Sequence, residues 1–233
     1  MADAIHCTPV PDGLDAEAAV AFPISYPTAA AALMWRGRVR PGDWVLVQGA
    51  AGGVGLAGLE VAKALGCRVV ARAAPFKHDL LRERGADLLL DSGLPFRDAV
   101  GAAAPGGVAC VLDTIGGDGF DEALRCLGDG GTLVTIGYAA GGIPMVPANI
   151  LLLKNIGVAG LNWGSYLGWS PGDGREAHAP RVRALWDQLV AWWQADALRP
   201  MVHARFPLAG FREAMAEVAG RRSAGRVVIR PQE

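Results

Sequence analysis

The 233-residue sequence has little net charge, few cysteines and no long apolar segment, and each shortage excludes a class of protein. Its 22 basic and 23 acidic residues give a formal net charge of -1, so no electrostatic attraction to nucleic acid or to an anionic membrane is expected. The four cysteines, Cys7, Cys67, Cys110 and Cys126, form no C-x-x-C pair and lie near no histidine cluster. The sequence therefore predicts neither a disulfide framework nor a bound metal.

Two further absences concern the membrane and the secretory pathway. No apolar run reaches the ~18–20 residues of a membrane helix. The N-terminus has neither the basic start nor the apolar stretch of a signal peptide. We therefore expect a cytoplasmic protein that has no membrane and no nucleic acid among its partners.

The chain is rich in apolar residues and in glycine. Hydrophobic residues make up 52% of the sequence, and there are 32 glycines. From residue 44 onward, short apolar runs alternate with segments of helical spacing. Continuous apolar runs are typical of parallel strands that are buried on both faces, and this alternation is typical of a doubly wound α/β domain. The expected strands cover 44–48, 68–71, 87–91, 108–113, 132–136 and 156–161, and the expected helices cover about 54–65, 77–84, 95–103, 118–127 and 149–155. We therefore predict an α/β Rossmann fold with a doubly wound, six-stranded parallel sheet.

A glycine-rich loop follows the first expected strand and precedes a helix. It runs from Gly49 to Gly55. A bound diphosphate needs free backbone N–H groups at a helix N-terminus and no Cβ where the backbone meets the phosphate. Gly52 and Gly53 would allow that close approach, and Gly55 would let the helix pack on the strand. The strand–turn–helix context favours a dinucleotide site; the alternative interpretation is a tight turn in a glycine-rich chain.

The end of the second expected strand bears on which dinucleotide binds. NAD-binding proteins usually carry an Asp or Glu there, which holds the ribose 2′-hydroxyl, whereas this chain has no acid before Asp79. Arg72 and Lys77 would instead pair with a 2′-phosphate. The pattern favours NADP(H), although both cations are also compatible with ordinary solvated surface residues.

The segments on either side of the alternation have a different character. An Ala-rich segment of helical spacing runs from Asp15 to Gly37; Asp15 would cap it, and Pro23 and Pro27 would interrupt it. Toward the C-terminus, we expect a loop at 168–180, an aromatic-rich helix at 180–196, a strand at 201–206, a helix at 208–220 and a strand at 226–229. The last three elements do not continue the alternation and would complete another sheet.

Short motifs spread in order along nearly the whole chain share their residues with one known family. They lie at residues 10–14, 23–29, 40–47, 49–55, 112–117, 136–138, 149–155 and 225–228. Together they resemble the medium-chain dehydrogenase/reductase superfamily, in its zinc-free quinone oxidoreductase-like branch.

The resemblance assigns roles to residues of the expected cofactor crevice. It implies that the segment Ala51, Gly52, Gly53 and Val54 holds the diphosphate, and that Lys77 binds the 2′-phosphate. It further implies that Thr114, Ile115, Gly137 and Tyr138 line the nicotinamide side, with Thr28, Asn162 and Trp163 beside them and Arg226 where the family usually has a lysine near the cofactor. Gly49 and Arg72 complete the expected site, and Thr28 and Tyr138 are the candidates to line the reacting end; no catalytic residue is assigned.

The chain also departs from the family's pattern. Ser92 stands where a tyrosine is expected beside the adenosine ribose, and Ala73 and Ala74 replace expected hydroxyl side chains; these differences weaken the case for a 2′-phosphate without reversing it. The family begins with a GroES-like catalytic domain of which most is missing here. We therefore expect a remnant of that domain and its linker at 1–27, an NADP-binding Rossmann domain at 28–163, a loop and connecting helix at 164–200, and a C-terminal return toward the catalytic domain at 201–233.

The resemblance implies an NADPH-dependent oxidoreductase that transfers hydride to a quinone or to an α,β-unsaturated carbonyl (enoyl) acceptor, without a metal. The alternative is an NADPH-binding module without catalysis of its own, such as a redox sensor or a truncated remnant. As in the family, we expect a homodimer in which the sixth strands, near 156–161, pair across a two-fold axis.

Overall fold

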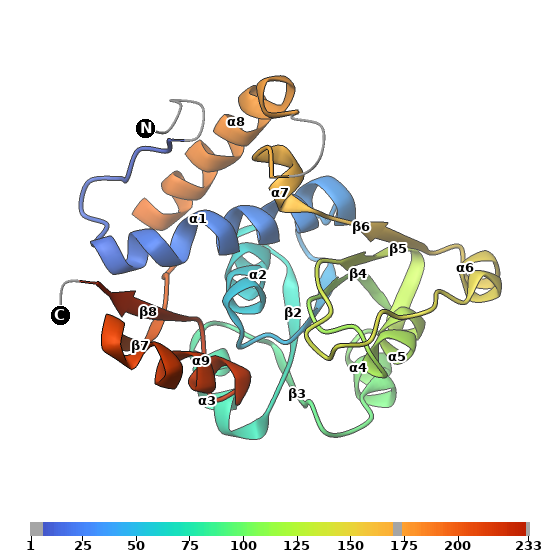
Figure 1. The fold of residues 1–233 in the computed structure, drawn as a ribbon. Coiled ribbons are helices and arrows are strands. Elements are labelled where there is room, and N and C mark those ends of the chain that lie inside the picture. Colours follow the sequence, from blue (N-terminus) through green and yellow to red (C-terminus); the bar gives the residue numbers. More distant parts are fainter. Residues whose placement is uncertain (1–6, 170–173, 232–233) are drawn as a thin grey trace.

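The computed structural model describes residues 7–169 and 174–231, which are built on a six-stranded parallel sheet (Figure 1). The strands are β1 (Trp44–Gln48), β2 (Arg68–Ala73), β3 (Leu88–Asp91), β4 (Val108–Asp113), β5 (Leu127–Thr135) and β6 (Gly157–Gly160). Their order across the sheet is β3-β2-β1-β4-β5-β6. The chain therefore starts in the middle, winds to one edge, returns and winds to the other, which confirms the predicted Rossmann fold.

Helices cover both faces of this sheet. They are α2 (Gly53–Ala64), α3 (His78–Glu83), α4 (Arg97–Ala103), α5 (Gly119–Cys126) and α6 (Ala148–Lys154). Successive residues of β1 enter different cores: Val45 and Val47 pack with Leu56 of α2, whereas Leu46 packs on the opposite face with Phe120 of α5. Burial on both faces explains why the strands are continuously apolar in sequence.

Strand β5 begins earlier than expected, at Leu127 instead of residue 132. Its first part contains Gly128, Gly130 and Gly131, which read as a turn. At Gly128 and Gly131 the backbones approach too closely for a side chain: an ideal Cβ on Gly128 would lie 2.2 Å from the carbonyl oxygen of Gly106, and one on Gly131 would lie 2.9 Å from that of Gly128. A local glycine pattern does not distinguish such a close approach from a turn.

The first helix runs through the two prolines that were expected to interrupt it. Helix α1 spans Ala16–Ala30, with Pro23 and Pro27 inside it. As expected, Asp15 caps it and accepts hydrogen bonds from two first-turn amides at 2.9 Å each. The expected break is wrong because the helix is held by tertiary packing, with Phe22 and Tyr26 buried between it and its neighbours, and such packing offsets the lost backbone hydrogen bonds.

Because α1 is unbroken, it continues through a π-helical turn, η2 (Ala31–Gly37), into one long apolar helix. Residues Ala16–Gly37 are long and apolar enough to cross a membrane by length and composition, contrary to the expectation that no apolar run reaches that length. However, 67% of the most apolar window is buried inside the fold. A core helix passes the same test, so this helix is weak evidence for a membrane segment.

The C-terminal third forms a second, smaller unit beside the sheet. It contains α7 (Trp163–Tyr166), α8 (Arg175–Gln194), β7 (Val202–Pro207), α9 (Phe211–Ala219) and β8 (Arg226–Arg230). Strands β7 and β8 pair with each other in parallel and form a two-stranded sheet of their own. Arg205 and Arg230 of these strands both form ion pairs with Glu17 of α1, which fixes the unit against the first helix.

Helix α8 starts at Arg175, five residues before the expected start at 180. Pro180 therefore lies inside the helix instead of at its first position. Pro180 is the sixth residue of α8, beyond the first turn, so it removes the hydrogen bond that an N–H at this position would donate to the carbonyl of Glu176.

The cysteines differ sharply in burial, which predicts selective alkylation. Cys67, Cys110 and Cys126 are buried, whereas Cys7 is exposed. Burial raises the pKa of the Cys67 and Cys126 thiols to about 11 and that of Cys110 to about 12. Because the thiolate is the reactive form, iodoacetamide at pH 8 is expected to modify one thiol of the folded chain and all four after denaturation, as measured by mass spectrometry. Equal labelling of all four in the folded state would contradict this packing.

Candidate functional site: a nucleotide crevice

The glycine loop joins the end of β1 to the start of α2 and is shaped by contacts that exclude side chains. Gly49 has a φ of +67°, a conformation that glycine adopts readily. An ideal Cβ on Gly55 would lie 2.0 Å from the carbonyl oxygen of Gly49. Gly52 is the N-cap of α2, and no side chain caps that end of the helix. The loop therefore presents the helix N-terminus without a capping side chain, as an anion-binding turn requires.

The C-terminal strand closes on this loop. The amide of Gly225 donates to the carbonyl of Ala51 at 2.9 Å, and Gly225 forms a parallel bridge with Gly52. The next residue, Arg226, reaches the start of α2: an ideal Cβ on Gly53 would lie 2.7 Å from its Nε. The structure thus brings Arg226, 173 positions further along the chain than Gly53, to the start of α2 beside the glycine loop.

Arg226 has an unusual electrostatic environment at this place. Its Nε donates to Ser25 Oγ at 2.9 Å, and burial lowers the pKa of its guanidinium. Within the described ranges, no carboxylate forms an ion pair with it. A half-buried cation therefore faces a helix N-terminus, where the helix dipole is also positive. The arrangement is complementary to a bound anion.

Lys77 and Arg72 lie near the end of β2 but have different surroundings. Lys77 Nζ donates to the carbonyls of Arg221 and Ser223 at 2.8 and 2.6 Å, and burial lowers its pKa. Arg72 donates to Gln48 Oε1 at 3.0 Å and to the carbonyl of Ser92 at 2.6 Å. The ammonium of Lys77 keeps one donor beyond these two, whereas the guanidinium of Arg72 is largely used inside the fold.

Arg221 is a residue of the crevice that the sequence reasoning missed. Its carbonyl accepts from Lys77, and its guanidinium donates to the carbonyl of Ala139 at 3.1 Å. It has a φ of +56°, which is uncommon outside glycine. Its place in a polar loop between α9 and β8 gave no local signal. Only the positive φ, which appears in the structure, marks it as a special position.

The ends of β4 and β5 form the other side of the crevice. Thr114 Oγ1 donates to the carbonyl of Gln48 at 3.0 Å. Asp113 Oδ1 accepts from the amides of Ile115 and Gly116 at 2.9 and 3.1 Å, while burial raises the pKa of this carboxyl. Asp113 therefore shapes the turn that carries Thr114 and Ile115 to the carboxyl end of the sheet, where ligands of open α/β sheets bind.

The remaining expected residues of this side differ in exposure. Tyr138 follows Gly137 after β5 and is 41% exposed. Trp163 is buried and stacks on Tyr166 with ring centroids 5.5 Å apart, whereas the preceding Asn162 is exposed. Thr28 is buried, and its hydroxyl donates to the carbonyl of Ile24 at 2.5 Å. Of these side chains, those of Tyr138 and Asn162 are exposed, and the hydroxyl proton of Thr28 is already used.

Within residues 7–169 and 174–231, no three His, Cys, Asp or Glu side chains gather in a geometry that could hold a metal ion. The polar groups of the crevice are instead backbone amides, cations and hydroxyls. That set suits a phosphorylated organic ligand better than a metal.

Comparisons with known proteins bear on the same region. The sequence profile of the zinc-binding dehydrogenase family matches residues 53–178. Quinone oxidoreductase-like protein 2 of Bos taurus is 37% identical over 224 residues, which are 94% of this chain and 62% of the bovine protein. The chain thus spans about three fifths of the length of the curated relatives it matches first.

Solved structures agree with this similarity. The quinone oxidoreductase of Thermus thermophilus, whose structures include a complex with NADPH, is 36% identical; the match has a TM-score of 0.81 and covers 96% of this chain and 69% of that one. A mycobacterial protein complexed with NADPH is 29% identical, with a TM-score of 0.85 over 95% of this chain and 68% of that one. The chain belongs to the zinc-binding dehydrogenase family, in the quinone oxidoreductase-like branch of the medium-chain dehydrogenase/reductase superfamily.

Proposed function

We propose that the chain binds NADP(H) in this crevice and is the nucleotide-binding part of an oxidoreductase that reduces a quinone or an α,β-unsaturated carbonyl compound. The observation that carries the proposal is the position of Arg226 against Gly53. A cation without an acidic partner, at the positive end of a helix, is complementary to an anion bound beside both of them. A diphosphate supplies that anion, and the glycines leave room for it.

The two ends of the nucleotide would be held by different groups. The amides at the N-terminus of α2 would bind the diphosphate together with Arg226. At the adenosine end, Lys77 and Arg221 lie in one hydrogen-bonded cluster and would pair with a 2′-phosphate. The NADPH complexes of two relatives support this choice of cofactor. Arg72 would act mainly by supporting the loop after β3, through its bond to the carbonyl of Ser92.

The nicotinamide end would lie over the ends of β4 and β5. When bound, the nicotinamide supplies the hydride, and the protein contributes orientation and a dry surface. Thr114, Ile115 and Gly137 would form the floor, Tyr138 one wall and Trp163 the far end. The role of these residues would be to position the ring. Among the described residues on this side, Tyr138 is the one with an exposed side chain that carries a hydroxyl group, which an acceptor could reach.

The cation that carries the proposal can be tested directly. Arg226→Gln is expected to raise the Kd for NADPH about tenfold to a hundredfold, since removal of one charge-assisted contact costs about 1.5–3 kcal/mol. The matched control is Arg212→Gln on the exposed surface of α9, which is expected to leave the Kd unchanged. Binding is measured by isothermal titration calorimetry. Equal affinity of the two variants would refute the role of Arg226.

Whether this chain turns over an acceptor alone is a separate question. The chain spans about three fifths of the length of its relatives. The alternative function is therefore an NADPH-binding module without catalysis of its own. Oxidation of NADPH is followed at 340 nm with 1,4-naphthoquinone and with an enoyl thioester as acceptors. Turnover with either supports the reductase; tight binding with no turnover supports the module; the absence of NADPH binding removes both.

The same proposal includes a homodimer through the edge of the sheet at β6. The apolar side chains of Ile143, Met145, Leu152 and Leu153 lie before and within α6, the element that leads into this edge, and each is at least 75% exposed. Such a patch beside an open strand edge favours association. Leu152→Glu is expected to convert a dimer to a monomer in light scattering, whereas Leu94→Glu, at an exposed leucine elsewhere, leaves the mass unchanged. A monomeric parent chain at micromolar concentration rules the dimer out.

The proposal retains the division expected from the sequence, with the Rossmann domain at 28–163 between the segments 1–27 and 164–200 and the C-terminal return at 201–233. A cytoplasmic location is part of it, and a small-molecule acceptor is the only other partner that it requires.

A further inference from the structure

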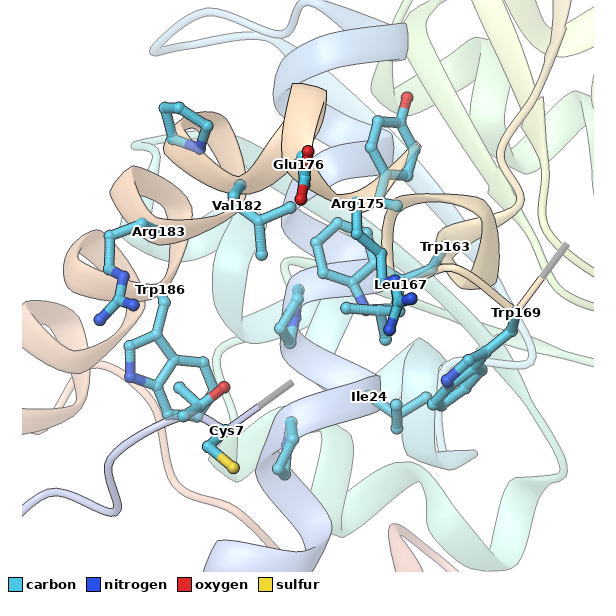
Figure 2. Close-up of a pocket in the computed structure, with 16 residues that line it drawn as sticks. Cys7, Ile24, Trp163, Leu167, Trp169, Arg175, Glu176, Val182, Arg183 and Trp186 are labelled. Carbon is cyan, nitrogen blue, oxygen red and sulfur yellow. The ribbon is translucent and has the colours of Figure 1, made fainter. Parts of the chain in front are cut away.

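A cavity of about 520 Å³ lies between α1, α7 and α8, away from the glycine loop (Figure 2). We call it the α1–α8 pocket and define it by Ile24, Trp163, Trp169, Arg175, Arg183 and Trp186. Its volume falls in the range of sites for small organic molecules. Trp163 is the one residue of the expected nucleotide site that lines it. The pocket and the nucleotide crevice therefore meet at one side chain and are otherwise separate.

Aromatic rings form much of the pocket wall, and neighbouring rings hold two of them in place. Trp163 stacks on Tyr166 at 28° between ring planes, and Trp186 meets Phe22 edge to face, with centroids 5.3 Å apart. Figure 2 shows Trp186 and Trp169 on opposite sides of the cavity. Trp169 is 68% exposed. Two indoles are thus held by neighbouring rings, and the indole of Trp169 is exposed. A flat aromatic ligand suits this wall, because its ring can stack on the exposed indole.

The polar groups of the pocket are mostly hydrogen-bond donors. Its charged lining residues are Arg175, Glu176 and Arg183. Among the described residues, Arg183 forms no ion pair. The indole Nε1 of Trp163 is buried and has no acceptor among the described residues. A ligand that matches this set accepts hydrogen bonds and carries negative charge.

We propose that the α1–α8 pocket is a binding site for a planar aromatic carboxylate, distinct from the nucleotide crevice. The ring lies between the indoles of Trp169 and Trp186, and the carboxylate pairs with Arg183 at the rim. Neither the ring stacking nor the charge pairing uses the glycine loop, so the site stands independently of NADP(H) binding.

The test is isothermal titration calorimetry of the 233-residue chain with 2-naphthoate, and with the uncharged 2-naphthalenemethanol as its matched probe. Trp169→Leu is expected to weaken both probes about fivefold, since it removes one stacking face. Arg183→Gln is expected to weaken 2-naphthoate about threefold and to leave the alcohol unchanged. Arg212→Gln, outside the pocket, is expected to change neither. Trp169 and Arg183 are both exposed, so these variants should fold; equal melting temperatures are the check.

Three outcomes overturn the proposal. One is a Kd for 2-naphthoate above about 1 mM. Another is equal affinity of the parent chain, W169L and R183Q. The third is displacement of 2-naphthoate by NADPH with no effect of either substitution, which would place the probe in the nucleotide crevice. Binding that persists with saturating NADPH, together with the two selective losses, supports a separate site.

Discussion

Substitution of Gly55 by alanine is expected to weaken NADPH binding at least about a hundredfold, or about 2.7 kcal/mol, and to lower the free energy of unfolding by about 3 kcal/mol. The added Cβ would lie 2.0 Å from the carbonyl oxygen of Gly49, and its next neighbours are also backbone atoms of Gly49 and Ala50. No side-chain rotation relieves such a contact. Either α2 moves away from β1 or the loop changes shape, and both displace the amides proposed to hold the diphosphate.

The matched control for this substitution is Gly101→Ala. Gly101 lies inside α4, and an ideal Cβ there meets no heavy atom within 4 Å. Alanine is the better helix residue by about 0.5–1 kcal/mol, so this variant is expected to gain stability and to bind NADPH like the parent chain. Binding is measured by calorimetric titration and stability by urea unfolding. If Gly55→Ala binds NADPH with the parent affinity, the close approach of helix and strand is not what forms the site.

Local patterns were sufficient to predict the elements that position the nucleotide. A strand buried on both faces must be apolar along its length, and Val45 to Val47 show that pattern in the sequence and that burial in the structure. The glycine loop was likewise predictable, because Gly55 is required by a close approach to the carbonyl of Gly49, six residues before it, and Gly49 by its own positive φ. Short-range constraints of this kind leave a direct mark on the sequence.

Contacts between distant segments left no such mark. Lys77 was expected to pair with a 2′-phosphate, and nothing in the sequence indicated that two carbonyls some 145 residues away also accept hydrogen bonds from its ammonium. Arg221 lies in a loop of ordinary polar composition, and its guanidinium reaches the carbonyl of Ala139, 82 residues earlier in the chain. Pro23 and Pro27 show the opposite error, since their strong local preference against a helix interior is overridden by packing that the sequence does not reveal.

A second large effect is expected at Glu60, a buried carboxylate of α2 that the sequence pattern did not single out. It is 3% exposed and accepts from Tyr26 Oη at 2.6 Å, from the amide of Arg199 at 2.9 Å and from the guanidinium of Arg84. Glu60→Gln nearly preserves the shape but removes the charge that compensates Arg84. It is expected to cost about 3–5 kcal/mol of unfolding free energy, or roughly 6–20 °C in melting temperature for a chain of this size.

The control is Lys63→Ala, which breaks the exposed ion pair with Asp87 on the same helix and is expected to cost less than about 1 kcal/mol. Tyr26→Phe removes one hydrogen bond and is expected to cost about 1–2 kcal/mol. Because Tyr26 and Arg84 bond to the same carboxylate, the double variant Tyr26→Phe with Glu60→Gln should cost less than the sum of the two single changes. Strict additivity in urea unfolding at pH 7 would show that the three groups act separately. Non-additivity would identify Glu60 as the residue through which α1, α2 and the loop after α8 stabilise one another. It would then also hold in place the helix whose N-terminus is proposed to bind the diphosphate.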